Sequence, residues 1–140
     1  MRIVLDTNIL ARANPSAAGP ARQILIEIAG SAEHVLIVSA FLLRELERVL
    51  GYPRLQSIWP LDAYEIAEYV HALESFAELV QPEVAADWPQ LLADPGDDPV
   101  LQTALVGRAD MLCTLDRHFY TQTVLEFCRR QGLSVCTDVE

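Results

Sequence analysis

Short and long hydrophobic patterns alternate along this chain. Runs rich in β-branched and other apolar residues predict strands at residues 3–5, 35–38, roughly 78–81, 111–114 and 134–136. Stretches with helical hydrophobic spacing predict helices over residues 17–29, 40–50, 61–76, 99–108 and 121–131. Because the strands are apolar almost throughout, they indicate a central, mostly parallel sheet of about five strands with helices on both faces. The expected fold class is therefore α/β, in three α/β/α layers.

Turn-forming residues separate these segments. Asn14-Pro15, Gly51-Tyr52-Pro53 and Asp94-Pro95-Gly96 break the pattern between elements, and Gly132 stands where a helix C-cap glycine belongs before the last strand. No repeat, low-complexity tract or linker interrupts the chain. Its 140 residues fit one unit with a proper core, so we expect a single domain over residues 1–140.

Composition excludes several classes of function. The net charge is −10 and every basic residue is arginine, so mechanisms that need a lysine, such as P-loop phosphate binding, are absent. No apolar stretch reaches the roughly 20 residues that span a bilayer, and the N-terminus lacks a signal-peptide layout. Three cysteines (Cys113, Cys128, Cys136) show no metal-ligand spacing, which predicts buried, reduced thiols. We expect a cytoplasmic protein with no membrane partner.

Three acidic residues fall at the ends of predicted elements, and a fourth lies within a helix that starts from the same edge. Asp6 ends the first strand, Asp116 follows the fourth, Asp98 precedes a helix, and Glu45 borders the apolar stripe of the helix over 40–50. In an open parallel sheet, ligands bind beyond the carboxyl ends of the strands, where the strand order reverses. Acids that meet at that edge predict a metal site, and carboxylate oxygens suit Mg²⁺ or Mn²⁺.

Each acid by itself has an ordinary structural explanation. Asp6 and Asp98 suit helix N-caps, Asp116 suits an Asx-turn that leads into a helix, and Glu45 suits an ion pair at the edge of its helix. Asp97 is not explained by capping, and its repulsion from Asp98 favours a bound cation. Capping explains the four positions together less well than a shared metal does.

At this point the sequence resembles the PIN-domain ribonuclease family, and in particular its VapC-like bacterial toxin branch. The likeness extends over about residues 1–137, with one departure at the Asp98-Pro99 step. It rests on four blocks in the family's order and spacing: Val4-Leu5-Asp6-Thr7-Asn8, Ser39 with Glu45-Leu46, Asp97-Asp98-Pro99-Val100-Leu101, and Ala109-Asp110-Met111-Leu112-Cys113-Thr114-Leu115-Asp116.

The resemblance implies a three-layer PIN-like fold and a Mg²⁺- or Mn²⁺-dependent acidic site. It also implies a homodimer and an antitoxin protein as partner. The residues that it assigns to catalysis and to the metal are Asp6, Glu45, Asp98 and Asp116, with Glu45 a ligand directly or through water. Asn8 and Thr114 match polar support positions of the family. Asp97 and Arg117 are further candidates for substrate contact or support.

The functional hypothesis is a metal-dependent endoribonuclease that hydrolyses RNA phosphodiester bonds, as the toxin component of a bacterial toxin–antitoxin pair. Phosphate contacts would come from an arginine rim of Arg12, Arg44, Arg48 and Arg117. One alternative is a catalytically inactive PIN-fold module that binds RNA or protein. A second is a metal-dependent phosphatase with Asp6 as nucleophile; the missing lysine and the asparagine at position 8 count against it.

Overall fold

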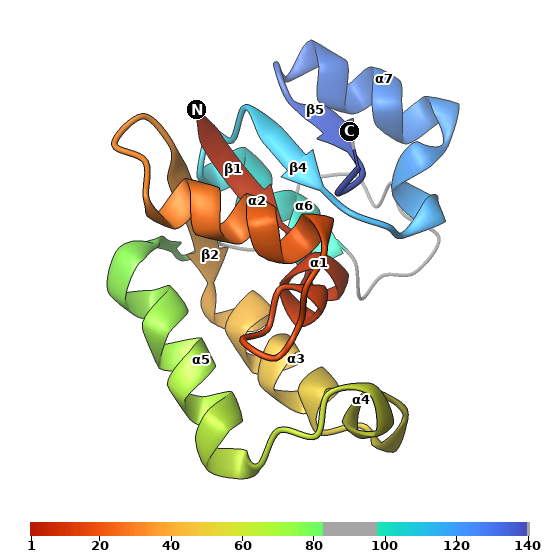
Figure 1. Ribbon diagram of the computed structural model, residues 1–140. Helices are drawn as coiled ribbons and strands as arrows, with labels where there is room; N and C mark the ends of the chain where they lie inside the picture. Colours follow the sequence, from red (N-terminus) through yellow and green to blue (C-terminus); the bar gives the residue numbers. More distant parts are fainter. Residues whose placement is uncertain (83–97, 140) are drawn as a thin grey trace.

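The sheet has five strands, and each neighbouring pair of strands is parallel. The computed structural model describes residues 1–82 and 98–139, the side chain of Asp98 excepted. The strand order is β3-β2-β1-β4-β5 (Figure 1). The strands are β1 (Arg2–Leu5), β2 (Val35–Ser39), β3 (Glu78–Val80), β4 (Met111–Cys113) and β5 (Ser134–Cys136). The order reverses between β1 and β4, because the chain builds outward from β1 through β2 and β3 before returning to its other side.

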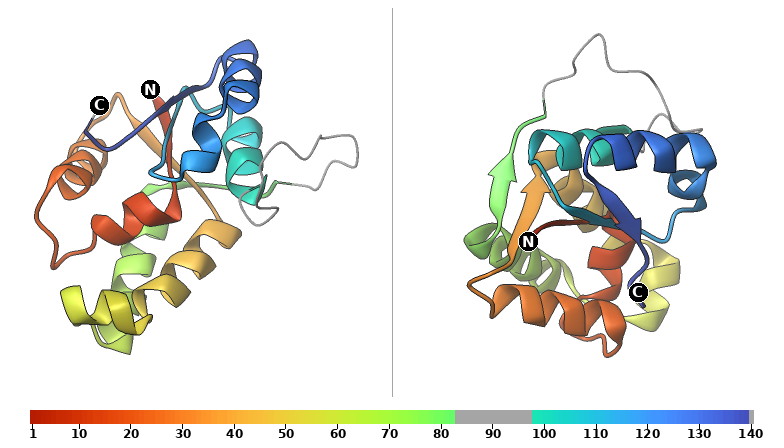
Figure 2. Two further views of the ribbon diagram at one scale, coloured as in Figure 1. Left: turned by 90° about the vertical axis from the view of Figure 1, so that its right-hand side faces the viewer. Right: turned by 90° about the horizontal axis from the view of Figure 1, so that it is seen from above.

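Helices cover both faces of this sheet, which confirms the predicted three layers. Figure 2 shows α6 and α7 on one face, with α2 and α5 on the other. The helices are α1 (Thr7–Arg12), α2 (Pro20–Ala29), α3 (Ala40–Leu50), α4 (Pro53–Ile58), α5 (Ala63–Phe76), α6 (Asp98–Val106) and α7 (Gln122–Arg130), with a 3₁₀ helix η2 (Arg117–Tyr120). None of the described helices is long and apolar enough to cross a membrane.

Three short helices had no predicted bounds, although capping by Asp6 and an Asx-turn at Asp116 were weighed as alternatives. They are α1, α4 and η2, each of six residues or fewer, which is too short for a hydrophobic period to stand out. The break at Gly51-Tyr52-Pro53 does end α3, but Pro53 also begins α4 as its first residue. Helix α2 starts later than expected because Pro20 takes its first position, after Gly19, whose φ is 154°.

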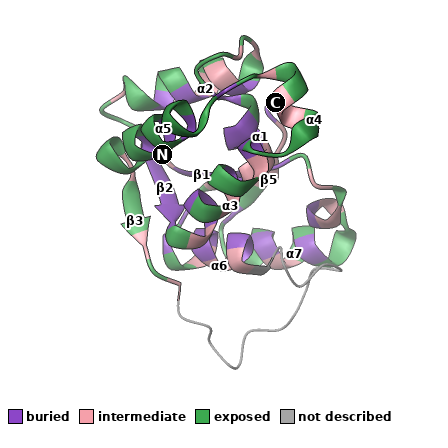
Figure 3. Cartoon of the chain, turned by 90° about the horizontal axis from the view of Figure 1, so that it is seen from below, coloured by how far each residue is buried: buried purple, intermediate pink, exposed green. Residues whose placement is uncertain are grey.

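Alternate residues of the strands enter two separate hydrophobic cores. Ile3 and Leu5 pack with α1, α2, α3 and α5, whereas Val4 packs with α6, η2 and α7. Figure 3 shows the buried residues on the strands and on the inner faces of the helices. Burial on both faces explains why the strands read as nearly continuous apolar runs.

The connection from α6 to β4 depends on close packing at Gly107. A Cβ atom there would lie 2.7 Å from Cγ2 of Ile37 on β2, closer than real contacts allow. The next residue, Arg108, adopts the left-handed conformation with φ of 53°. This tight turn sets how α6 lies over the sheet, and hence where the start of α6 falls at the carboxyl edge.

The cysteines form no disulfide bond among the described residues. Burial raises the pKa of Cys128 to about 11, as expected for an inert thiol. Cys113 and Cys136 face each other on β4 and β5 with their sulfur atoms 3.2 Å apart. The prediction of burial is wrong for Cys136, which is partly exposed because β5 is an edge strand.

Candidate active site

Asp6 is held rigidly at the carboxyl end of β1. Its backbone amide donates to the carbonyl of Cys113 at 2.9 Å, which extends the β1–β4 pairing, and its side chain then caps α1. Oδ1 accepts from the Thr7 amide at 2.7 Å, and Oδ2 accepts from the Thr114 hydroxyl at 2.7 Å. The side chain is buried. Asp6 therefore caps a helix and also presents a carboxylate beside the reversal of strand order.

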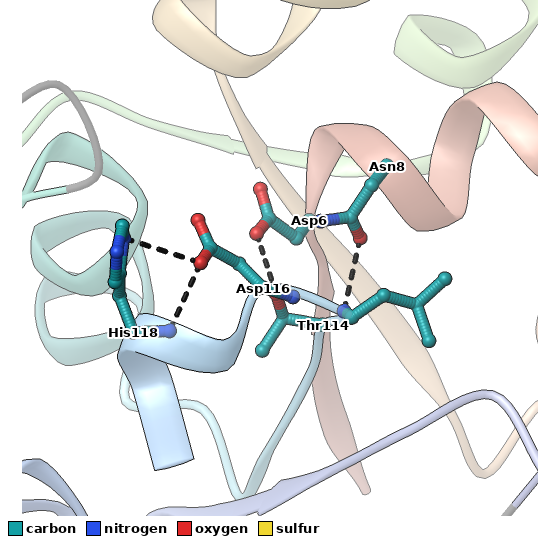
Figure 4. A network of polar contacts seen from close by, with 6 residues as sticks. Asp6, Asn8, Thr114, Asp116 and His118 are labelled. Carbon is teal, nitrogen blue, oxygen red and sulfur yellow. Dashed lines mark hydrogen bonds and ion pairs between the residues drawn. The ribbon is translucent and has the colours of Figure 1, made fainter. Parts of the chain in front are cut away.

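Thr114 connects the two aspartates of this edge (Figure 4). Its hydroxyl donates to Asp6 and accepts from the backbone amide of Asp116 at 3.0 Å. Asn8 strengthens the same junction, because its Oδ1 accepts from the Leu115 amide at 3.2 Å. The support roles expected for Thr114 and Asn8 thus correspond to hydrogen bonds that join the loop after β4 to the start of α1.

Asp116 caps the 3₁₀ helix η2, as an Asx-turn would. Its Oδ1 accepts from the His118 amide at 3.0 Å and lies 3.3 Å from His118 Nδ1. The Asp116 side chain is 24% exposed, in contrast to the buried Asp6. Asp116 is thus the more accessible of the two aspartates at this edge of the sheet.

Glu45 reaches this edge from α3. Ser39, the last residue of β2, caps α3 by accepting from the Leu42 amide at 3.4 Å, and Leu42 and Leu46 bury the inner face of the helix. Glu45 lies beside this face, and both its oxygens accept from Arg48 Nη2, at 2.5 and 2.6 Å. The ion pair that the sequence allowed for Glu45 is therefore present, with Arg48 as its partner.

Three of the four predicted acids line one cavity. Asp6, Glu45 and Asp116 surround a space of about 200 Å³ at the carboxyl edge of the sheet. Its remaining walls are Thr7, Asn8, Phe41, Val49 and Val100. The cavity therefore combines carboxylates from three separate elements with a partly apolar wall.

The other predicted site residues stand differently. Asp98 is the first residue of α6, whereas it was expected to precede the helix as its N-cap. It lies two positions before Val100, which lines the cavity. The structure does not describe the side chain of Asp98. Asp97 lies outside the described residues altogether. Arg117 is exposed on η2 and is not part of the cavity wall. Arg12 pairs with Asp138 after β5, with Nε 3.4 Å from Oδ2.

The electrostatics of the cavity favour a bound cation. Burial raises the pKa of Asp6, hydrogen bonds from Thr114 and Thr7 oppose that rise, and the nearby Asp116 carboxylate adds to it. A positive ion between the two carboxylates would offset both the burial and the repulsion.

The chemistry of the donors matches Mg²⁺ or Mn²⁺, which prefer carboxylate oxygens. Among the residues that the structure describes, however, no three histidine, cysteine, aspartate or glutamate side chains form a ready-made metal-binding group. Both Glu45 oxygens are engaged by Arg48 instead. A metal would have to draw Glu45 from this partner.

Sequence reasoning missed Thr103, which fixes α6 against α3. This buried threonine donates to Ser39 Oγ at 2.9 Å and lies 2.7 Å from the Pro99 carbonyl. It also missed Tyr120, whose hydroxyl donates to the Thr114 carbonyl at 2.7 Å. A threonine on an otherwise apolar helix face was the available signal for Thr103, but its partner is remote in sequence.

An acidic cavity beyond the carboxyl ends of a parallel sheet, with helices on both faces, defines the class of protein. A family model described as PIN domain matches residues 2–118, and the chain belongs to that family. PIN domains are generally nucleases that use divalent metal ions. A search of curated proteins found no match to this chain.

Two solved structures share the fold. VapBC2 from Rickettsia felis, crystallised with a DNA fragment from its promoter, aligns with a TM-score of 0.64 and 16% identity over 98% of each chain. FitAcB from Neisseria gonorrhoeae aligns with a TM-score of 0.56 and 16% identity over 99% of each chain. The alignments confirm a PIN-like α/β/α fold over nearly the whole length.

Proposed function

We propose that this chain is a metal-dependent endoribonuclease. The observation that carries the proposal is the shared cavity of Asp6, Glu45 and Asp116, three carboxylates brought by β1, α3 and the loop after β4. Membership of the PIN domain family supports nuclease chemistry. RNA is proposed as the substrate because the sequence motifs resemble those of PIN-domain ribonucleases.

Mg²⁺ or Mn²⁺ would be held by Asp6, Glu45 and Asp116, with Asp98 proposed as the fourth ligand. The bound ion would act as a Lewis acid on the phosphate and would lower the pKa of water, which makes water a better nucleophile at neutral pH. The chain itself provides orientation. Thr114 and Thr7 fix the two oxygens of Asp6, and His118 holds one oxygen of Asp116.

The apolar part of the cavity has its own role. Phe41, Val49 and Val100 limit the water around the carboxylates, which strengthens their attraction for a cation. The chain carries a net charge of −10, so its overall field repels nucleic acid. Binding of RNA would therefore depend on local positive charge, such as a metal ion held in the cavity.

We further propose that the nuclease is the toxin of a toxin–antitoxin pair, with an antitoxin protein as partner and a homodimer as its assembly. The motif resemblance to VapC-like toxins supports this, and so does the shared fold with VapBC2 and FitAcB. It remains separable from the catalytic proposal, because an active nuclease need not be toxic.

The test is cleavage of a panel of single-stranded RNAs by purified protein with Mn²⁺, compared with protein in EDTA and with Asp6→Asn. Cleavage by the parent alone, and only with metal, is the expected result. RNA binding without cleavage would instead identify an inactive binding module. A covalent phosphate trapped on Asp6 would identify a phosphatase.

A further inference from the structure

Glu45 is the one acid of the described cavity that is paired with an arginine. Arg48, three residues later on α3, directs Nη2 at both carboxylate oxygens, at 2.5 and 2.6 Å. The Glu45 side chain is 28% exposed and that of Arg48 60%, so the pair stands at the rim of the cavity. Glu45 lines the cavity together with Asp6 and Asp116, whereas Arg48 is not part of its wall.

Arg48 is also supported from the side by an aromatic ring. Its guanidinium carbon lies 5.9 Å from the centroid of the Tyr52 ring, a cation–π contact between α3 and the start of α4. Tyr52 is exposed, so the contact guides the guanidinium without burying it. Released from Glu45, Arg48 would still be held near the cavity by this ring and by the rigid helix.

We infer that Arg48 competes with the metal for Glu45, and that it binds the substrate phosphate once the metal has drawn Glu45 away. The inference rests on the proposed function. It makes the binding of metal and the binding of nucleic acid mutually dependent, because both change the partner of Glu45.

The physical basis is that the same oxygens of Glu45 would serve the guanidinium or the ion. A divalent ion also repels the nearby positive charge, so coordination displaces the arginine. Exposed ion pairs are weak, which allows this exchange. The freed guanidinium needs an anion, and its planar fork suits the oxygens of a phosphodiester. In a chain of net charge −10, the rim would gain a cation for RNA only after metal enters.

The experiment measures Mn²⁺ binding by titration calorimetry for the parent, Arg48→Gln and Arg54→Gln. Arg54 is exposed on α4 and provides a control for the loss of one positive charge. We expect Arg48→Gln to bind Mn²⁺ roughly two- to fivefold more tightly, the range set by an exposed ion pair. Arg54→Gln should match the parent.

A second measurement follows a short, labelled single-stranded DNA by fluorescence anisotropy, with its integrity checked on a gel. The parent should bind it more tightly with Mn²⁺ than without, and Arg48→Gln should lose most of that gain. Tighter metal binding combined with weaker oligonucleotide binding is a result that a merely helix-stabilising pair would not produce.

Three outcomes would overturn the inference while leaving the proposed function standing. Equal Mn²⁺ affinity of Arg48→Gln and the parent would show that the ion pair does not compete with metal. Equal effects of the Arg48 and Arg54 changes would show that any loss of positive charge has the same result. Mn²⁺ binding by Glu45→Gln as tight as that of the parent would remove Glu45 as a ligand. A fourth outcome, no Mn²⁺ binding by the parent, would overturn the proposed function together with the inference.

Discussion

The Thr114 hydroxyl donates to Asp6 Oδ2 at 2.7 Å across the junction of β1 and β4, although the two residues are 108 positions apart. The Thr114 hydroxyl oxygen also accepts from the Asp116 amide, so this one hydroxyl orients the side chain of Asp6 and the backbone of Asp116. The geometry of Thr114 is that of a support for the carboxylates.

Replacement of Thr114 by valine should therefore impair the proposed activity without unfolding the protein. Valine keeps the shape but removes the donor to Asp6, and loss of such support typically lowers metal affinity or activity by about 10–100-fold. The pKa of Asp6 should rise further, so the acidic limb of the pH–rate profile should move to higher pH. Thr123→Val, at an exposed position of α7, is the control. Equal cleavage rates for the two variants would contradict the assigned role.

Asp6→Asn should stabilise the metal-free protein at neutral pH. Burial raises the pKa of Asp6, so its contribution to stability is present below the unfolded pKa and is lost as pH rises through the folded pKa. Asparagine removes this loss and can still cap α1. In EDTA, thermal unfolding should show a melting temperature a few degrees above that of the parent at pH 7, with a smaller difference near pH 4. A difference independent of pH would argue against ionised Asp6 as the cause.

Mn²⁺ should reverse that order of stability. An ion that binds only the folded state, at about 100 times its dissociation constant, adds about 2.7 kcal/mol to the free energy of unfolding. The melting temperature of the parent should rise by several degrees on addition of Mn²⁺, and EDTA should restore it. Asp6→Asn should respond much less. A parent protein that melts at the same temperature with and without Mn²⁺ would speak against the metal site.

Gly107→Ala should destabilise the fold by about 1–3 kcal/mol, the usual cost of overpacking. The added Cβ would lie 2.7 Å from Ile37 Cγ2, so α6 or β2 must shift. Gly30→Ala is a matched control, because its Cβ would meet only the Ile26 carbonyl at 3.4 Å. Urea unfolding of both variants measures the difference. If Gly107→Ala unfolds at the same midpoint as the parent, the close packing of α6 on β2 is not needed.

Growth arrest on induction in a bacterial host is the expected result for the toxin proposal. Asp6→Asn should leave growth unaffected at the same level of protein. Colony counts after induction measure the effect, and an immunoblot confirms equal expression. Normal growth with the parent protein would remove the toxin proposal and leave the nuclease proposal standing.

Much of the fold was predictable because its signals are local. The apolar strands and the helix over 40–50 were located from hydrophobic spacing within a few neighbouring residues. The bounds of short helices such as α1 and η2 were not predicted, since one or two turns carry no clear hydrophobic period. The glycine expected at the end of the last helix was predicted correctly, because Gly132 adopts a positive φ of 76°.

The candidate site was predictable only in part. Asp6 and Asp116 follow strands that are parallel neighbours of one sheet, so their meeting at one edge could be argued from topology. The link between Thr103 and Ser39, 64 positions apart, could not, because it depends on the distance between α3 and α6. The pairing of Glu45 with Arg48 was open as well, because spacing on a helix permits the contact without requiring it.

By itself, the sequence determined the alternation of strands and helices and placed acids at the ends of these elements, because both follow from local patterns of side chains. The tertiary structure alone decided that Asp6, Glu45 and Asp116 share one cavity and that Arg48 engages Glu45 at its rim. The physical reason is that packing of the helices on the sheet sets distances between remote residues, and side-chain partners are selected only once those distances exist.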